Sequence, residues 1–245
     1  MIRRLCIFLL ALTCQGASVV RIPFVGCKSD GQVGPLPAPS DADKVVQIDA
    51  SIARKLAYYR AEMGSGVLAP RGWYCFGGYG SGGSALFVTP QPIGDNFPST
   101  WPEIAGPAVQ INYSDGGTSG RYTVGRVIAR VFPRRKAFVL FIIESGLGLA
   151  SDFPFGPYPN DKLTYHGDRI VEYQTPPHSE GLGTISRLQA NGDPVEGAAI
   201  LQGPTPDLLL LTVRLPPDKY SLASHIIRQV EREDAESRAK TTPQR

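Results

Sequence analysis

Two stretches of the chain hold side chains that could carry out general acid/base chemistry. His178-Ser179-Glu180 lies in a loop rich in Pro and Gly, before a segment (184–190) that we expect to form a short helix. An imidazole and a carboxylate near a helix N-terminus can exchange protons with a substrate at neutral pH. Glu144 follows an unbroken apolar run, residues 137–143, which is typical of a strand buried on both faces.

Glu144 is the best single polar candidate, because ligands in open α/β sheets gather beyond the carboxyl ends of strands. One hypothesis is therefore a cell-envelope hydrolase or transferase that uses Glu144, His178 and Glu180 as acid/base groups. This hypothesis requires the three side chains to converge in one pocket. The simpler interpretation is that Glu144 bonds to loop amides at a strand end, and that His178 and Glu180 are solvated loop residues.

Two glycine-rich segments, 77–84 and 114–120, offer bare backbone amides that could cradle an anion. The first lacks the Lys-Ser/Thr ending of a P-loop, and neither of its serines fits G-x-S-x-G, so a flexible hairpin is the simpler interpretation. The second precedes an expected helix, although Asp115 within it would repel a phosphate. The candidate ligand-binding residues are Gly80, Ser81, Gly82, Gly117, Thr118 and Ser119.

Several other kinds of chemistry find no support in the sequence. His166, His178 and His225 are scattered without the paired spacing of zinc ligands, so we expect no metal ion. No motif indicates a cofactor. The formal net charge of +3 falls to +1 when Arg3 and Arg4 of an N-terminal signal are removed, and this near-neutral balance argues against nucleic-acid binding.

Cysteine spacing predicts one disulfide bond. Cys6 and Cys14 lie within the expected signal, which leaves Cys27 and Cys75 in the mature chain. An even count in an oxidising compartment favours a structural bridge between these two. A reactive or metal-binding thiol pair is the alternative, but it would prefer a C-x-x-C spacing, which is absent.

The expected helices come from apolar periodicity. Val45, Ile48, Ile52, Leu56, Tyr59 and Met63 recur at three- and four-residue steps, which predicts an amphipathic helix. Residues 124–131, which end before Pro133, and residues 222–230 follow the same spacing. The charged residues after 232 predict a disordered tail.

The expected strands alternate with these helices. They comprise residues 72–76, 85–89, 109–113, 137–143, 168–175, 197–201 and 208–213. Strands interleaved with three or four helices predict an α/β (or α+β) fold, a single-domain layered sandwich with a mixed β-sheet. The predicted organisation is a signal peptide (1–17), an extended segment (18–40), a globular α/β domain (41–232) and a charged tail (233–245).

The N-terminal residues predict export. Residues 1–4 carry two positive charges, residues 5–12 form an apolar core too short to cross a bilayer, and Gly16, Ala17 and Ser18 offer cleavage sites. A lipid anchor at Cys14 is the alternative, although Thr13 before it is a poor match. No later run is apolar enough to span a membrane. We therefore expect a periplasmic or secreted, non-catalytic domain that binds a small molecule or an envelope protein through its glycine-rich loops.

Overall fold

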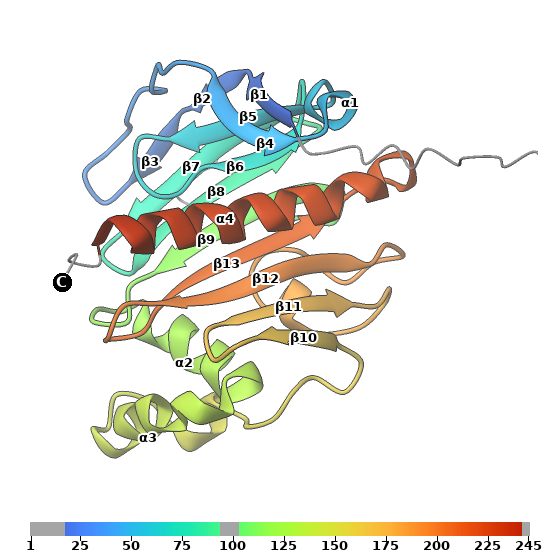
Figure 1. Cartoon of the computed structure of the whole chain (residues 1–245). Helices are drawn as coiled ribbons and strands as arrows, with labels where there is room; N and C mark the ends of the chain where they lie inside the picture. The colour runs from blue at the N-terminus through green and yellow to red at the C-terminus, as the bar shows by residue number, and fades with distance from the viewer. Residues whose placement is uncertain (1–17, 94–102, 242–245) are drawn as a thin grey trace, which may run out of the picture.

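The computed structural model describes residues 18–93 and 103–241 of the chain, and within them one large sheet of eight strands organises the fold (Figure 1). Only the short β3 pairs in parallel, with β7, and the other neighbours are antiparallel. In spatial order the strands are β10 (Lys162–His166), β11 (Ile170–Thr175), β12 (Val195–Gln202), β13 (Asp207–Arg214), β9 (Ala108–Ser114), β8 (Gly83–Thr89), β7 (Tyr74–Gly80) and β3 (Ser29–Gly31).

Two smaller sheets form the N-terminal part. One contains β2 (Phe24–Cys27), β5 (Leu56–Ala61) and β6 (Val67–Pro70), and the other pairs β1 (Ser18–Ile22) with β4 (Lys44–Ile48). The α-helices of the described ranges are α1 (Ala50–Ala53), α2 (Arg121–Val131), α3 (Lys136–Glu144) and α4 (Ala223–Thr241). No helix within 18–93 and 103–241 is both long and apolar enough to cross a membrane.

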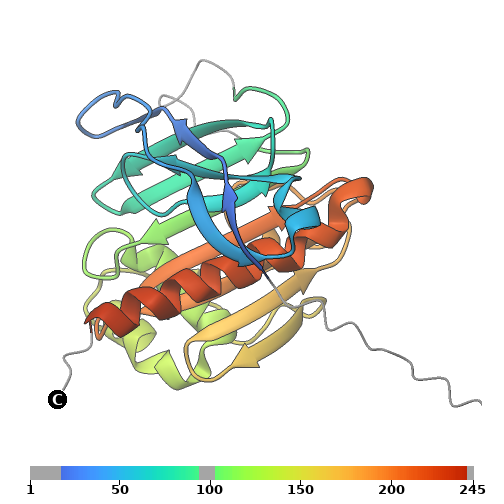
Figure 2. The same ribbon diagram turned by 45° about the horizontal axis from the view of Figure 1, so that its top comes forward.

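The large sheet separates two apolar layers. Figures 1 and 2 show α4 lying across one face, beside the smaller sheets, while α2 and α3 cover the other face. Strand β13 illustrates the division, because Leu209 and Leu211 face α4 and Leu208 and Leu210 face α2. Side chains that alternate along a strand reach opposite faces, so a run of leucines fits a strand covered on both sides.

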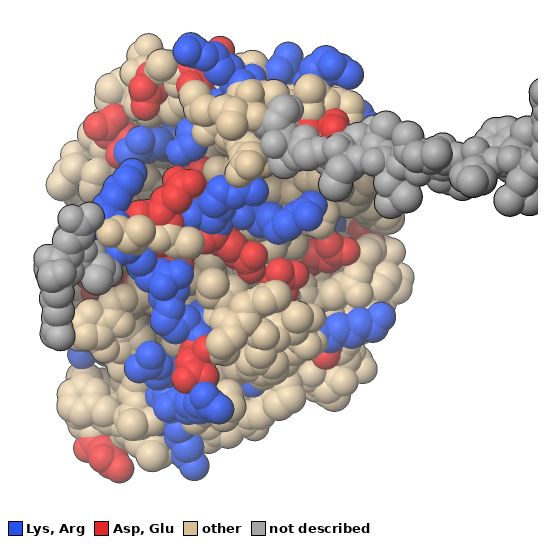
Figure 3. Space-filling model, in the orientation of Figure 1, with Lys and Arg blue, Asp and Glu red and all other residues tan. Residues whose placement is uncertain are grey.

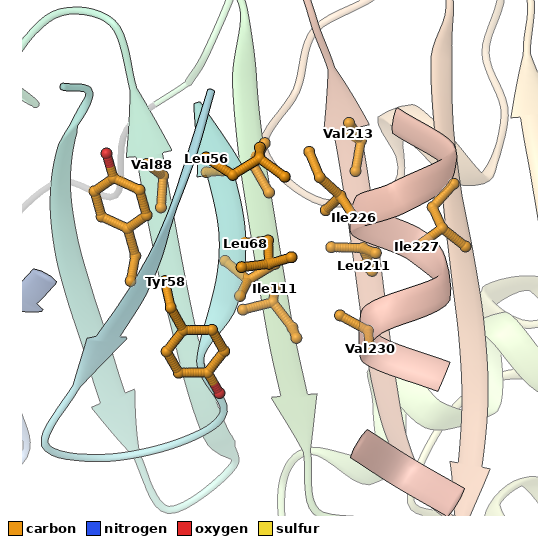
Figure 4. Close-up of a cluster of buried hydrophobic side chains, with 14 of the residues drawn as sticks. Leu56, Tyr58, Leu68, Val88, Ile111, Leu211, Val213, Ile226, Ile227 and Val230 are labelled. Atoms are coloured by element: carbon orange, nitrogen blue, oxygen red, sulfur yellow. The ribbon is translucent and has the colours of Figure 1, made fainter. Parts of the chain in front are cut away.

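The layer beneath α4 is the larger of the two cores. Ile226 and Val230 of α4 point toward Leu211 and Val213 of β13, and Ile227 lies on the other side of the helix in the same cluster (Figure 4). On the other side of this cluster lie Leu56, Tyr58, Leu68, Val88 and Ile111 of β5, β6, β8 and β9. The small N-terminal sheet therefore shares a core with the large one.

The predicted disulfide between Cys27 and Cys75 is confirmed. It joins the end of β2 in the small sheet to β7 in the large one, with the two Cα atoms 5.4 Å apart. The bond therefore ties the two sheets together. The predicted fold class, an α/β sandwich with a mixed sheet and three or four helices, is also confirmed.

The predicted amphipathic helix over residues 45–63 is wrong. This stretch forms β4, the one-turn helix α1 and β5. In β5 every residue except Arg60 is buried, because the strand lies between other layers and both of its faces are covered. Apolar residues on a doubly buried strand can fall by chance at helical spacing, and short apolar runs do not separate the two cases.

The predicted strand over residues 137–143 is also wrong, since these residues belong to helix α3. Pro133 begins a short 3-10 turn, residues 133–135, that leads directly into α3. Its run of apolar residues has no polar positions that would reveal a helical period. The expected helix at 184–190 is likewise reduced to one 3-10 turn at Leu182–Thr184.

The C-terminal helix is longer than the apolar pattern indicated. Residues 233–241, which we expected to be disordered, continue α4 to Thr241. Asp234 explains this extension: it is buried and accepts hydrogen bonds from Arg169 at 2.9 Å, Arg238 at 3.0 Å and Gln202 at 2.9 Å. The predicted signal peptide, with Cys6 and Cys14, and the last four residues of the chain lie outside the described residues.

Candidate functional site

The two glycine-rich segments lie against each other. The first is a tight hairpin, in which Ser81 and Gly82 connect β7 to β8. The second connects β9 to α2. The backbone N–H of Asp115 donates to the carbonyl oxygen of Gly82 at 3.0 Å, so the loops are joined directly.

Glycine is required where the loops touch. A Cβ atom on Gly120 would lie 2.2 Å from the Gly82 carbonyl oxygen, and one on Gly82 would lie 2.9 Å from Ser119 Oγ. Gly83 has a φ of +138°, and a Cβ there would lie 1.9 Å from the carbonyl oxygen of Tyr113. The glycines of the hairpin thus allow close backbone contact between β8, β9 and the second loop.

Two carboxylates hold the second loop in shape. Asp115 Oδ1 accepts from the N–H of Gly117 at 2.7 Å, and Asp207 Oδ1 accepts from the N–H of Gly116 at 2.9 Å. The other oxygen of Asp207 accepts from the Tyr113 hydroxyl at 2.8 Å. Burial, followed by this bond to Asp207, raises the pKa of Tyr113 to about 12. The Asp115 carboxylate is therefore engaged with its own loop.

A groove of about 730 Å³ opens beside the joined loops, a size that suits a small molecule. Its walls come from the hairpin, from Ser119 and Gly120, from α2, and from residues 185–187. Its floor is the face of β8, β9 and β13 that points toward α2. The groove is therefore built from four separate parts of the chain.

The floor of the groove is polar at its centre. Gln110 is only 1% exposed, and its side-chain amide donates to Asn112 Oδ1 at 2.9 Å. Its carbonyl oxygen accepts from Ser186 Oγ at 3.1 Å. Phe87 and Leu210 on the neighbouring strands are fully buried. A buried amide in an apolar layer is costly unless its groups are bonded, and here each amide end of Gln110 has a half-buried partner.

The charge of the groove is positive. Among the described residues that line it, Arg126 and Arg187 are the charged ones, and none of these described residues carries a carboxylate. Hydroxyl groups of Ser81, Ser84, Ser114, Ser119, Thr123 and Ser186 complete the lining. The site thus offers guanidinium, hydroxyl and amide groups, which suit a polar ligand with acceptor oxygens.

Four of the six residues expected to bind a ligand line this groove, namely Gly80, Ser81, Gly82 and Ser119. Gly117 instead lines a second hollow, next to α3. Thr118 supports the turn, since its hydroxyl donates to the Asp115 carbonyl oxygen at 3.2 Å. That a ligand binds these residues stays a prediction.

The polar floor and the basic wall of the groove were not predicted from the sequence. Gln110 and Asn112 are separated by one residue in an otherwise apolar strand, and this spacing places both on one face. That pattern could have identified them. Arg126, Ser186 and Arg187 carried no such signal, because only the tertiary fold brings α2 and residues 185–187 to the loops.

The expected acid/base residues lie on two different parts of the molecule. Glu144 is the exposed last residue of helix α3, so it does not follow a strand as expected. His178 and Glu180 are exposed in the loop after β11, where the N–H of His178 donates to the Asn191 carbonyl oxygen at 2.7 Å. Within the described ranges, no hydrogen bond or ion pair joins Glu144 to either of them. Catalysis by these residues stays an untested prediction.

One cluster of possible metal ligands arises from the tertiary fold. His166 Nε2 lies 3.0 Å from Glu172 Oε1, and these two with Glu231 of α4 place their ligand atoms within 4.8 Å of one another. Burial and the nearby Glu172 raise the pKa of Glu231. The sequence could not indicate this cluster, because its members come from β10, β11 and α4.

No protein-family model, curated protein or solved structure matches this chain. The class of this protein therefore rests on its own fold and groove. It is a disulfide-linked α/β sandwich with a polar, positively charged groove at the junction of two glycine-rich loops.

Proposed function

We propose that this protein is a non-catalytic, exported binding domain whose groove holds a small polar ligand. The observation that carries the proposal is the buried Gln110 network at the floor of the groove. Its polar groups sit beneath a cavity that the two loops complete. Ligand sites typically combine such a concave shape with a few fixed polar groups.

The chemistry of the lining indicates which ligands fit. Guanidinium groups bind anions such as phosphate and carboxylate, and the surrounding hydroxyl and amide groups favour oxygen-rich molecules. The described part of the lining holds neither an imidazole nor a carboxylate, the usual acid/base groups, and we therefore propose binding rather than catalysis. A phosphorylated or carboxylated sugar has these properties.

An NMR titration of the labelled protein tests the binding proposal. The probes are glucose 6-phosphate, succinate and uncharged maltose, each added to the same sample. We expect saturable shifts in the amide signals of residues 80–83 and 119–120 with an anionic probe, and weaker binding to the Arg126→Gln variant. The matched control is Arg54→Gln, which changes an exposed arginine remote from the groove.

The binding proposal fails under two results. One is that none of the three probes shifts the groove amides, and native mass spectrometry of the protein recovered from its producing cells detects no bound molecule. The other is saturable shifts confined to residues outside the groove. A probe that is chemically converted during the titration would instead favour the enzyme hypothesis.

Export is the second half of the proposal. The charged start and the apolar run of residues 1–12 support it, and the disulfide is typical of an oxidising compartment. The intact mass of the protein from envelope and culture fractions tests it. We expect a chain that lacks about the first 17 residues. A lipid attached to Cys14 would reveal a membrane anchor, and a full-length chain confined to the cytoplasm would contradict export.

A further inference from the structure

Helix α3 exposes apolar side chains that no other described part of the chain covers. Residues 137–143 are all apolar, but only Val139 and Ile142 are buried in the layer below. Leu140 and Phe141 point away from that layer, and Phe141 is 60% exposed. A helix that is apolar all round is normally covered on every side, so the outer side of α3 lacks a partner within the described chain.

Two further large apolar side chains are exposed in the segment that follows the helix. Leu149 is 70% exposed and Phe155 is 48% exposed. The ammonium group of Lys136, in the first turn of α3, lies 5.0 Å from the centre of the Phe155 ring. We name Leu140, Phe141, Leu149 and Phe155 the α3 patch. The Lys136 ammonium group therefore places a positive charge directly beside an exposed aromatic ring of the α3 patch.

Arginines border the patch on one side. A hollow of about 610 Å³ next to α3 has apolar walls that include Phe138, Phe141 and Pro206. Arg121, Arg134 and Arg135 also line it, and its lining contains no carboxylate from the part of the chain that the structure describes. Arg134 pairs with Asp168 outside the hollow, whereas Arg135 forms no ion pair within the described residues. The hollow therefore joins apolar walls to guanidinium groups.

The positive charge of the chain is concentrated in this region. Residues 121–156 contain six Lys and Arg against two Asp and Glu, whereas the rest of the chain contains 19 against 20. At the lower end of the molecule, where Figure 1 places α3, Figure 3 shows uncharged surface next to several blue groups and fewer red ones. An anionic partner is thus favoured over a neutral or cationic one.

We propose that the α3 patch docks on an anionic phospholipid bilayer. Phe141, Leu149 and Phe155 enter the boundary between headgroups and acyl chains, and Arg121, Arg135 and Lys136 contact lipid phosphates. Interfacial binding of this kind combines apolar burial with attraction to anionic lipid. The proposal does not depend on the ligand groove, which has a different lining.

A second copy of this chain fits the patch less well. Two copies meeting through α3 would bring their positively charged regions together, and like charges across an interface oppose association. A bilayer with anionic headgroups supplies the opposite charge over the whole patch. This comparison of charge is the reason for choosing a membrane as the partner.

Vesicle flotation of the whole protein tests the proposal. We expect the protein to float with vesicles of phosphatidylcholine mixed with phosphatidylglycerol, much less with phosphatidylcholine alone, and less again at high salt, since salt screens the attraction. Phe141→Asp should weaken partitioning into the vesicles roughly tenfold or more, because it removes an aromatic ring that the bilayer would bury. Arg135→Glu should weaken it as well.

Each variant has a matched control on another surface. Val33 is 80% exposed and Lys55 is exposed, and both lie outside the α3 region, so Val33→Asp and Lys55→Glu should float like the unmodified protein. Thermal melting of all four variants separates loss of binding from loss of fold. The proposal is overturned if the mixed vesicles bind no protein, or if Phe141→Asp and Val33→Asp reduce flotation equally. It is also overturned if the protein floats with no vesicle and instead forms a dimer that the Phe141→Asp substitution dissociates.

Discussion

The carbonyl oxygen of Gly82 accepts a hydrogen bond from the backbone N–H of Asp115 at 3.0 Å, which makes two loops distant in sequence one structural unit. The first loop closes a hairpin and the second leads into α2. Their contact forms one wall of the groove. Changes at this contact should therefore affect both stability and the shape of the candidate site.

Gly120→Ala should destabilise the protein by about 1–3 kcal/mol, the usual cost of overpacking. Its φ of −60° is accessible to alanine, so the cost arises from the Cβ lying 2.2 Å from the Gly82 oxygen. Urea unfolding measures the change. The control is Gly106→Ala, where a Cβ would meet nothing within 4 Å. Equal stability of the two variants would show that the loops do not pack as described.

Removing the disulfide should lower stability by about 4 kcal/mol in the chain-entropy model, because the bridge closes a loop between residues 48 apart. The test compares urea unfolding of the intact protein with that of a Cys27→Ser, Cys75→Ser double variant. Reductant should destabilise the intact protein and leave the double variant unchanged. A reductant effect of equal size on both would contradict the role given to the bridge.

Asp234→Asn should cost about 1–3 kcal/mol, because it weakens hydrogen bonds from two arginines and a glutamine to a buried carboxylate. We expect this loss of stability to be smaller than the loss from breaking a fully buried ion pair, because both arginines are partly exposed. Glu236→Gln, an exposed change on the same helix, should have little effect. Helical content by circular dichroism should show whether the end of α4 frays in the Asp234 variant.

Stability should fall as the pH rises above the ordinary value of 4.5 for Glu231, toward its raised pKa in the folded protein. Over this interval the folded state binds more protons than the unfolded state, so increasing pH favours unfolding. Burial is the main cause, followed by repulsion from Glu172, whereas His166 and Arg228 oppose the shift.

Glu231→Gln should remove this part of the pH dependence, so its stability relative to the unmodified protein should increase with pH across that interval. Urea unfolding at a series of pH values measures the difference, and Glu236→Gln serves as the exposed control on α4. Parallel curves for the unmodified protein and the Glu231 variant would contradict the assignment.

Some features of this protein could be read from local pattern alone. The strands around Val109 and Leu209 were predictable, because apolar runs bounded by turn residues specify doubly covered strands. The disulfide followed from the presence of two cysteines outside the expected signal. The hairpin interpretation of the first glycine-rich segment agrees with the turn at Ser81 and Gly82 between β7 and β8.

The tertiary structure decided what local pattern left ambiguous. Residues 56–61 form a strand although their apolar residues fall at helical spacing, and residues 137–143 form a helix although their apolar run shows no helical period. In both cases the state of the segment depends on what packs around it. Asp234 likewise orders the end of α4 only because Arg169 and Gln202 approach from other elements. The groove itself has no local signature, since its floor, loops and arginines meet only when the sheet is assembled.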